Sequence, residues 1–220
     1  MEAPRIIVTG LRGGAGKTLL ALGLTRALRG MGTPVKPYKK GPDYIDAAWL
    51  TRAALHPCTN LDPFFLSGER LRALVAHTLP AGHCAVIEGN RGLFDGRDVE
   101  GSCSTAELAR VLDCPVLLSL DCTKMTRTAA AVVAGVAHFE PGVRLAGVVL
   151  NHVASERHEG IVRRAIETYT DVPVLGALPR LRHNPLPERH MGLVDCADAL
   201  AVDAVLEQLA ALVRTHVDIS

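Results

Sequence analysis

The stretch Gly10-Leu11-Arg12-Gly13-Gly14-Ala15-Gly16-Lys17-Thr18 decides the fold of this chain. The β-branched run Arg5–Thr9 before it predicts a buried strand, and the apolar pattern from Thr18 to Arg29 after it predicts a helix. A strand, a glycine-rich loop, Lys-Thr and a helix are the parts of a phosphate-binding loop. The glycines let backbone N–H groups turn toward an anion, and the helix N-terminus adds partial positive charge. We therefore expect a nucleotide here, with Lys17 on its phosphates and Thr18 on Mg²⁺.

The loop departs from the plain phosphate-binding pattern, which would need glycine at position 11 where this chain has leucine. Counted from Gly10 it is one residue longer. This longer variant is typical of dethiobiotin synthetase and of the MinD/ParA and nitrogenase-iron-protein ATPases. An ordinary glycine turn before a helix is the alternative, but the lysine, the threonine and both flanks argue against it. The residues expected to contact the nucleotide are Gly10, Arg12, Gly13, Gly14, Ala15, Gly16, Lys17, Thr18 and Leu19.

The composition is that of one globular domain covering residues 1–220. The formal net charge of +1 gives no reason to expect nucleic acid or an anionic membrane as a partner. No stretch approaches the roughly 20 apolar residues of a membrane span. The six cysteines form no C-x-x-C pair, so we interpret them as reduced thiols in a cytoplasmic protein and not as a metal site.

Apolar runs alternate with helical patterns along the whole chain, which predicts an α/β fold with a mostly parallel sheet and helices on both faces. The expected strands are Arg5–Thr9, Val35–Tyr38, Cys84–Glu88, Pro115–Leu120, Leu145–Leu150 and Val172–Leu175. The expected helices are Thr18–Arg29, Asp46–Ala54, Gly68–His77, Thr105–Leu112, Thr126–Phe139, Glu156–Tyr169 and Ala197–Val213.

Polar, glycine-containing segments follow these strands, and ligands of a parallel sheet bind at the edge where such segments meet. The second strand is followed by Lys39-Lys40-Gly41-Pro42-Asp43-Tyr44-Ile45-Asp46. Asp46 could cap the next helix. Asp43 could hold Mg²⁺ or orient a substrate, and Lys39 could neutralise a phosphate or a substrate carboxylate.

A second acidic segment is Glu88-Gly89-Asn90-Arg91-Gly92-Leu93-Phe94-Asp95-Gly96. Glu88 ends an apolar strand, the position at which phosphate-loop proteins place a carboxylate linked to Mg²⁺. A solvated acidic turn is the alternative, but a carboxylate at the end of a core strand is costly unless it is paired. Asp95 supplies another carboxylate.

Later strand ends carry weaker signals. Asp121 or Thr126 is expected to cap the following helix. Asn151 could offer its amide to the edge of adenine. Lone histidines are more often structural than catalytic, although His190 stands in an Arg-His context.

Four segments in the same order resemble the cobyrinic acid a,c-diamide synthase family, and the resemblance runs from Thr9 to about Val194. The segments are Lys39 to Asp46, Glu88 to Gly96, Gly147-Val148-Val149-Leu150-Asn151 and Pro187-Glu188-Arg189-His190-Met191-Gly192-Leu193. The first and the last are specific together, because neither is a general feature of phosphate-loop proteins.

The resemblance implies an amidoligase that uses ATP and Mg²⁺ to phosphorylate a tetrapyrrole carboxylate, after which ammonia displaces the phosphate. It also implies a homodimer. By the family pattern Lys39 faces the transferred phosphate, and Asn151 and Arg180 lie near adenine. The implied catalytic residues are Lys17, Lys39, Asp43, Asp46 and Asp95, and the implied metal ligands are Thr18, Asp43 and Glu88.

This chain departs from the family in three ways. Family members are about twice as long and carry a C-terminal glutaminase domain with a nucleophilic cysteine, whereas no cysteine here stands in a glycine-rich nucleophile elbow. Ammonia is therefore expected from a missing domain, a partner subunit or solution. Lys40, Asn90 and Arg91 are more polar than in the cobalamin-pathway members and are more similar to a branch thought to amidate siroheme.

The third departure is Arg12, which occupies the place of the signature lysine of MinD-type ATPases. It leaves open a dimerising switch ATPase. A ligase similar to dethiobiotin synthetase is a further alternative.

Overall fold

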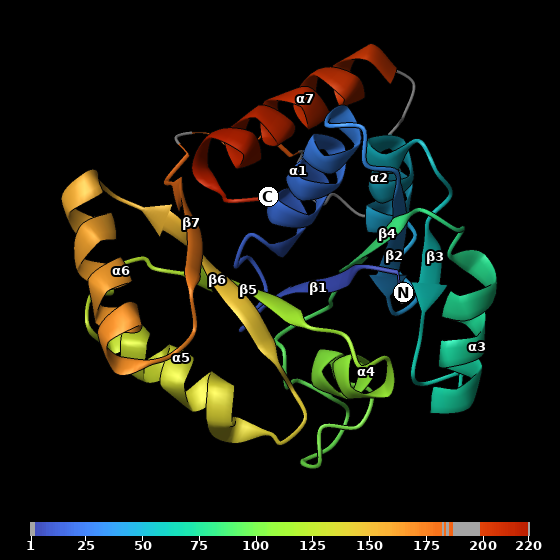
Figure 1. Cartoon of the computed structure of the whole chain (residues 1–220), viewed down its shortest axis with the longest axis horizontal. Helices are drawn as coiled ribbons and strands as arrows, with labels where there is room; N and C mark the ends of the chain where they lie inside the picture. Colours follow the sequence, from blue (N-terminus) through green and yellow to red (C-terminus); the bar gives the residue numbers. More distant parts are fainter. Residues whose placement is uncertain (1–2, 182, 184, 187–198, 220) are drawn as a thin grey trace.

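The computed structural model describes residues 3–181, 183, 185–186 and 199–219 (Figure 1). In this part of the chain a seven-stranded sheet has the order β3-β2-β4-β1-β5-β6-β7, and neighbouring strands run parallel. The strands are β1 (Arg5–Gly10), β2 (Val35–Lys40), β3 (Thr59–Leu61), β4 (Cys84–Glu88), β5 (Val116–Asp121), β6 (Leu145–Val153) and β7 (Val174–Pro179).

Helices cover both faces of the sheet, because successive side chains of a strand point to opposite faces. Ile7 of β1 packs into the core beneath α3 to α6, whereas Val8 packs into the core beneath α1, α2 and α7. The helices are α1 (Lys17–Gly30), α2 (Ile45–Ala54), α3 (Gly68–Thr78), α4 (Thr105–Val111), α5 (Thr128–Phe139), α6 (Glu156–Tyr169) and α7 (Ala199–His216). The predicted α/β class, parallel sheet and two helical layers are confirmed.

Helix α7 lies along α1, far from it in sequence (Figure 1). The close approach depends on Gly23, since a Cβ there would lie 2.6 Å from Val213 Cγ2 and 2.7 Å from the Leu209 carbonyl oxygen. α7 thereby supports the helix that begins at the glycine-rich loop.

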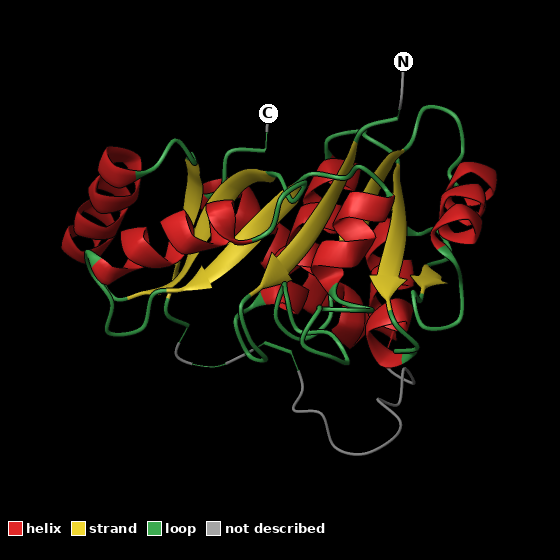
Figure 2. Ribbon diagram, turned by 90° about the horizontal axis from the view of Figure 1, so that it is seen from below, coloured by secondary structure: helices red, strands yellow, loops and turns green. Residues whose placement is uncertain are grey.

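The topology places the loops of interest together. The chain leaves β1 through α1 toward β2 on one side, and leaves β5 through α5 toward β6 on the other. A crevice forms at the carboxyl ends of strands where connections diverge in this way. In Figure 2 the strand arrowheads point toward one edge of the sheet, where the loops gather.

The prediction from sequence missed one strand and was wrong about the caps of two helices. β3 was not predicted. The N-cap of α2 is Tyr44, so the capping role expected of Asp46 is wrong; Asp43 Oδ1 instead accepts the Asp46 N–H at 3.0 Å. No side chain caps α5, so neither Asp121 nor Thr126 has the capping role expected of it.

Two further features bear on the expectations from sequence. No helix among the described residues is long and apolar enough to span a membrane. The thiols of Cys58, Cys84, Cys103, Cys114 and Cys122 are free. Cys196, His190 and the segment from Pro187 to Leu193 lie outside the described residues.

Candidate nucleotide-binding site

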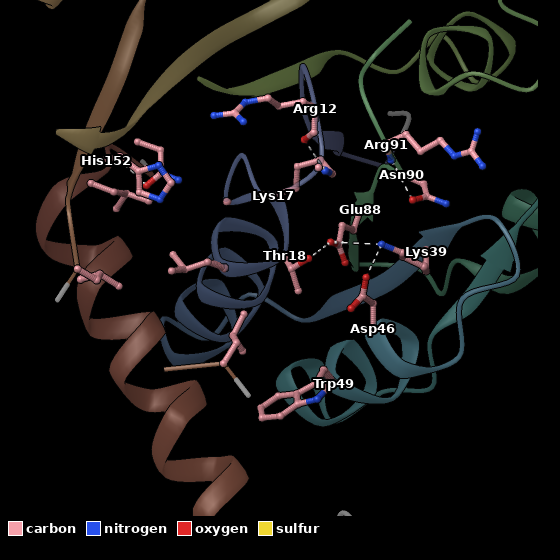
Figure 3. A pocket seen from close by; sticks show the side chains of 18 of the residues that line it. Arg12, Lys17, Thr18, Lys39, Asp46, Trp49, Glu88, Asn90, Arg91 and His152 are labelled. Carbon is pink, nitrogen blue, oxygen red and sulfur yellow. Dashed lines mark hydrogen bonds and ion pairs between the residues drawn. The ribbon is translucent and has the colours of Figure 1, made fainter. Parts of the chain in front are cut away.

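A cavity of about 770 Å³ lies at the carboxyl edge of the sheet, beside the glycine-rich loop (Figure 3). Its centre is formed by the loop and the first turn of α1. One end is walled by residues that follow β2 and β4, and the other by residues of β6, β7 and α7. The lining residues predicted from sequence are Arg12, Gly13, Gly14, Gly16, Lys17, Thr18, Leu19, Lys39, Asp46, Glu88, Asp95 and Asn151.

The loop is held in shape by neighbouring strands. Gly14 and Gly16 have φ of 73° and 85°, which L side chains rarely adopt. The Ala15 carbonyl oxygen accepts hydrogen bonds from Ser119 Oγ at 2.7 Å and from Asn151 Nδ2 at 3.1 Å. Ala15 therefore shapes the loop without lining the cavity. Gly10 also lies outside the lining, and its carbonyl oxygen accepts from the Leu93 N–H at 2.8 Å.

A buried charge network borders the start of α1 (Figure 3). Thr18 donates its hydroxyl to Glu88 Oε1 at 2.5 Å. Lys39 Nζ lies 2.7 Å from Asp46 Oδ2 and 3.3 Å from Glu88 Oε1, and it also donates to the Gly89 carbonyl oxygen at 3.3 Å. Lys39, Asp46 and Glu88 are buried. The Lys39 ammonium thus bridges the Asp46 and Glu88 carboxylates. This bridge lies beside Thr18, which is expected to bind the metal.

The electrostatics of this network follow from burial and charge. Burial raises the pKa of Glu88, and the nearby Asp46 carboxylate raises it further, against the lowering effect of Lys39. Burial alone would lower the pKa of Lys39, but the Glu88 and Asp46 carboxylates outweigh it and raise that pKa above its ordinary value. Lys39 therefore stays charged and holds the two acids together.

The chemistry of this corner fits Mg²⁺. Glu88 Oε2 is buried and has no hydrogen-bond partner in the described part of the chain, beside the Thr18 hydroxyl. Mg²⁺ binds through one or two carboxylates and keeps its other positions for water and phosphate. No group of three or more His, Cys, Asp or Glu residues able to hold a metal occurs among the described residues. Thr18 and Glu88 are the residues that would hold the ion.

The predicted metal ligand Asp43 is not among the residues that line the cavity. One of its carboxylate oxygens accepts the Asp46 N–H, so it shapes the turn that presents Asp46. Its roles in metal binding and catalysis stay predictions.

The end of the cavity beyond Glu88 is polar. Asp95 Oδ2 accepts the Gly92 N–H at 3.0 Å and closes a tight turn. Asn90 and Arg91 also line the cavity, and Arg91 has a φ of 52°. Figure 3 shows the guanidinium of Arg91 pointing away from Lys17, on the side opposite Arg12. This end therefore offers a cation at a distance from the phosphate loop. Trp49, which no sequence signal marked, forms part of the wall.

The opposite end is mostly apolar. It is lined by Asn151, His152, Leu178, Pro179, Leu181, Leu186 and Leu212. Sequence reasoning identified only Asn151 here; the αL backbone of His152, with φ 58°, has no signal in the sequence. Arg180, predicted near adenine, is exposed and does not line the cavity.

Asp121 connects this end to the phosphate loop. It accepts hydrogen bonds from the Arg12 guanidinium, from Thr123 N and Oγ1, and from His152 Nδ1 at 3.1 Å. Burial would raise the pKa of Asp121, but these hydrogen bonds outweigh it and hold the pKa well below its usual range. Lys17 Nζ meanwhile donates to the Arg12 carbonyl oxygen at 3.1 Å.

The parallel sheet and its glycine-rich loop define a P-loop nucleotide-binding protein. Chloroplast FtsY from Physcomitrella patens shares the fold, with a TM-score of 0.56 and 16% identity over 94% of this chain and 66% of that one. FtsY from Elizabethkingia anophelis, in complex with GDP, has a TM-score of 0.55 and 16% identity, covering 80% of this chain and 57% of that one.

The chain belongs to the CobQ/CobB/MinD/ParA nucleotide binding domain family, whose model matches residues 6–194. It is 43% identical to a cobyrinate a,c-diamide synthase of Magnetococcus marinus, over 98% of this chain and 46% of that protein. It is 44% identical to a hydrogenobyrinate a,c-diamide synthase of Brucella anthropi, over 94% of this chain and 47% of that protein. The resemblance predicted from the motifs is confirmed, and the chain spans about half the length of these relatives.

Proposed function

We propose that this chain is the ATP-binding, carboxylate-activating part of an amidoligase that acts on a tetrapyrrole polycarboxylate. The observation that carries the proposal is the buried network of Thr18, Glu88, Lys39 and Asp46 beside the phosphate loop. It supplies a metal corner and a fixed ammonium next to a cavity that continues past the nucleotide phosphates toward Asn90 and Arg91.

The proposed reaction has two steps. A substrate carboxylate oxygen attacks the γ-phosphorus of ATP, the bond to the β-phosphate oxygen breaks, and ADP leaves an acyl phosphate. Ammonia then attacks the acyl carbon, the carbon–oxygen bond to phosphate breaks, and an amide, phosphate and a proton are released. Lys17 neutralises charge on the transferred group, and Lys39 keeps the metal-facing carboxylate in place.

The relatives' names support the substrate class, because cobyrinate and hydrogenobyrinate are the acids named for them. The cation at the far end of the cavity suits a polyacid. Arg91 supplies a guanidinium at that end, whereas Lys40, the last residue of β2, is buried and does not line the cavity. A siroheme-type acid remains within this proposal, since Lys40, Asn90 and Arg91 are the residues that distinguish the chain from the cobalamin-pathway pattern.

We propose that ammonia comes from glutamine through a glutaminase domain or subunit that accounts for the rest of the relatives' length. The free thiols support a reducing, cytoplasmic compartment. A homodimer is part of the same proposal.

The test is ATP turnover with ammonium chloride and one acid at a time: cobyrinate, hydrogenobyrinate, nickel-sirohydrochlorin, siroheme or diaminopelargonate. We expect phosphate release that depends on a tetrapyrrole acid, with a product lighter by about one mass unit for each carboxyl converted to an amide. Hydroxylamine should trap the acyl phosphate as a hydroxamate when ammonia is omitted. Stimulation by diaminopelargonate alone would identify the ligase similar to dethiobiotin synthetase.

A second candidate, a dimerising switch ATPase, is favoured by one observation: Arg12 has a side chain that is 70% exposed and stands on the phosphate loop. In that case no acid would stimulate turnover. ATP would drive dimerisation, measured by sedimentation, and Arg12→Ala would abolish it. The amidoligase proposal expects Arg12→Ala to leave acid-dependent hydroxamate formation measurable.

A further inference from the structure

The apolar end of the cavity is where the base of a bound nucleotide would lie. Phosphates belong at the loop between Gly13 and Thr18, and the metal corner at Glu88 lies toward the polar end. The remaining wall is built from leucines and a proline of β7, α7 and the residues after β7, which suit the face of a purine. The polar atoms available at this end then decide which purine is accepted.

Asn151 is poorly placed for that choice. Asn151 is 3% exposed, and each end of its amide already makes one hydrogen bond inside the protein: Nδ2 with the Ala15 carbonyl oxygen, and Oδ1 with the His152 N–H at 2.9 Å. The amide therefore supports the phosphate loop and the backbone of the next residue.

His152 is better placed. Its αL backbone, fixed by that same bond to Asn151, turns the ring into the cavity wall, and the side chain is 35% exposed (Figure 3). Nδ1 lies 3.1 Å from Asp121 Oδ1. A carboxylate can only accept a hydrogen bond, so Nδ1 carries the hydrogen. Asp121 also pairs with the Arg12 guanidinium. In the imidazole tautomer with its hydrogen on Nδ1, Nε2 is an acceptor, and it has no hydrogen-bond partner among the described residues.

We infer that His152 Nε2 selects adenine, by accepting a hydrogen bond from the 6-amino group of the base. Guanine carries an oxygen at that position, which is also an acceptor, so the two lone pairs would repel. Asp121 is the positioning residue, since it fixes which ring nitrogen carries the hydrogen. The inference rests on the proposed use of ATP and names what distinguishes ATP from GTP in this chain.

The experiment compares three nucleotides that differ at one position: ATP, purine riboside triphosphate, which lacks the 6-amino group, and GTP. Dissociation constants are measured by calorimetry at pH 8 for the whole chain and for His152→Ala. We expect the unaltered chain to bind ATP about 3- to 10-fold more tightly than purine riboside triphosphate, the effect of one hydrogen bond, and GTP more weakly still. In His152→Ala the preference for ATP over purine riboside triphosphate should disappear.

Two further variants sharpen the result. Asp121→Asn presents an amide that can donate to Nδ1 and so stabilise the other tautomer, and it should move the preference toward GTP. His138→Ala is the matched control, because His138 is an exposed histidine on α5 and does not line the cavity; it should keep all three constants.

The inference is overturned if His152→Ala weakens all three nucleotides equally, which would mean that the ring only stacks on the base. It is also overturned if the unaltered chain binds ATP and purine riboside triphosphate equally well, a result that needs no variant to fold. If the chain binds no nucleotide at all, the proposed function itself fails.

Discussion

The hydroxyl of Thr18 donates a hydrogen bond of 2.5 Å to Oε1 of Glu88 and so joins the first turn of α1 to the last residue of β4. The other oxygen of Glu88 is buried without a hydrogen-bond partner among the described residues. A cation beside that oxygen would satisfy it, which makes Glu88 the most direct test of the metal corner.

Glu88→Gln should lower metal-dependent ATP turnover by about 100-fold or more, because an amide cannot supply the negative charge. Nucleotide binding measured in EDTA should change little. Titration of turnover with Mg²⁺ checks the result, and Glu167→Gln, at an exposed position of α6, is the control. An unchanged magnesium dependence in Glu88→Gln would remove Glu88 from the metal site.

Lys39→Met should destabilise the fold by about 3–5 kcal/mol, since it leaves the buried Glu88 and Asp46 carboxylates without their shared cation. Urea unfolding measures the effect. Adding Asp46→Asn to Lys39→Met should recover part of the loss, because one uncompensated charge is removed. Strictly additive losses would contradict a coupled network.

The hydrogen bonds of Asp121 predict that the stability of the folded chain depends on pH. Its pKa is depressed in the folded chain by bonds from Thr123, His152 and Arg12 that outweigh burial, so its stabilisation is present above the unfolded value, about 3.9, and is lost as the pH falls toward the folded value. Asp121→Asn should therefore be less stable than the unaltered chain at pH 5, and the gap should narrow toward pH 3. Denaturant unfolding at several pH values measures the gap, and a constant gap would contradict the depressed pKa.

Gly16→Ala should abolish nucleotide binding and destabilise the loop. Gly16 has a φ of 85°, and a Cβ there would lie 2.0 Å from Asn151 Nδ2. Binding of a fluorescent ATP analogue and thermal unfolding measure both effects. The matched control is Gly135→Ala in α5, where a Cβ meets nothing within 4 Å; it should leave binding intact and stabilise the helix by roughly 0.5–1 kcal/mol.

The fold was predictable because each predicted strand is an apolar run and the helices repeat with a helical period. β3 was missed because Thr59–Leu61 is three residues long and, within the described part of the chain, pairs with β2 alone. The strand ends were placed too early for β6, which continues through polar Asn151 and His152 to Val153. The strand continues because Asn151 pairs with Asp121 of β5 and Val153 pairs with Pro179 of β7, which residue type alone does not indicate.

The candidate site could be predicted where a short sequence pattern is typical of a single role. The Gly-Lys-Thr run and a glutamate at the end of an apolar strand could be placed without coordinates. The local hydrogen bond at this turn is accepted by Asp43 and not by Asp46, because the sequence cannot say which of two neighbouring aspartates accepts a backbone N–H. The role proposed for His152 could not be predicted, since it depends on a left-handed backbone and on a carboxylate 31 residues away.

Two separate strands hold the crest of the phosphate loop through one atom, the carbonyl oxygen of Ala15, which Ser119 and Asn151 both contact. The loop is thus preorganised: its shape is inherited from the sheet and does not have to be induced by an incoming anion. Binding of the nucleotide phosphates should therefore cost the loop little conformational entropy. More of the free energy of the phosphate contacts then contributes to the affinity for the nucleotide.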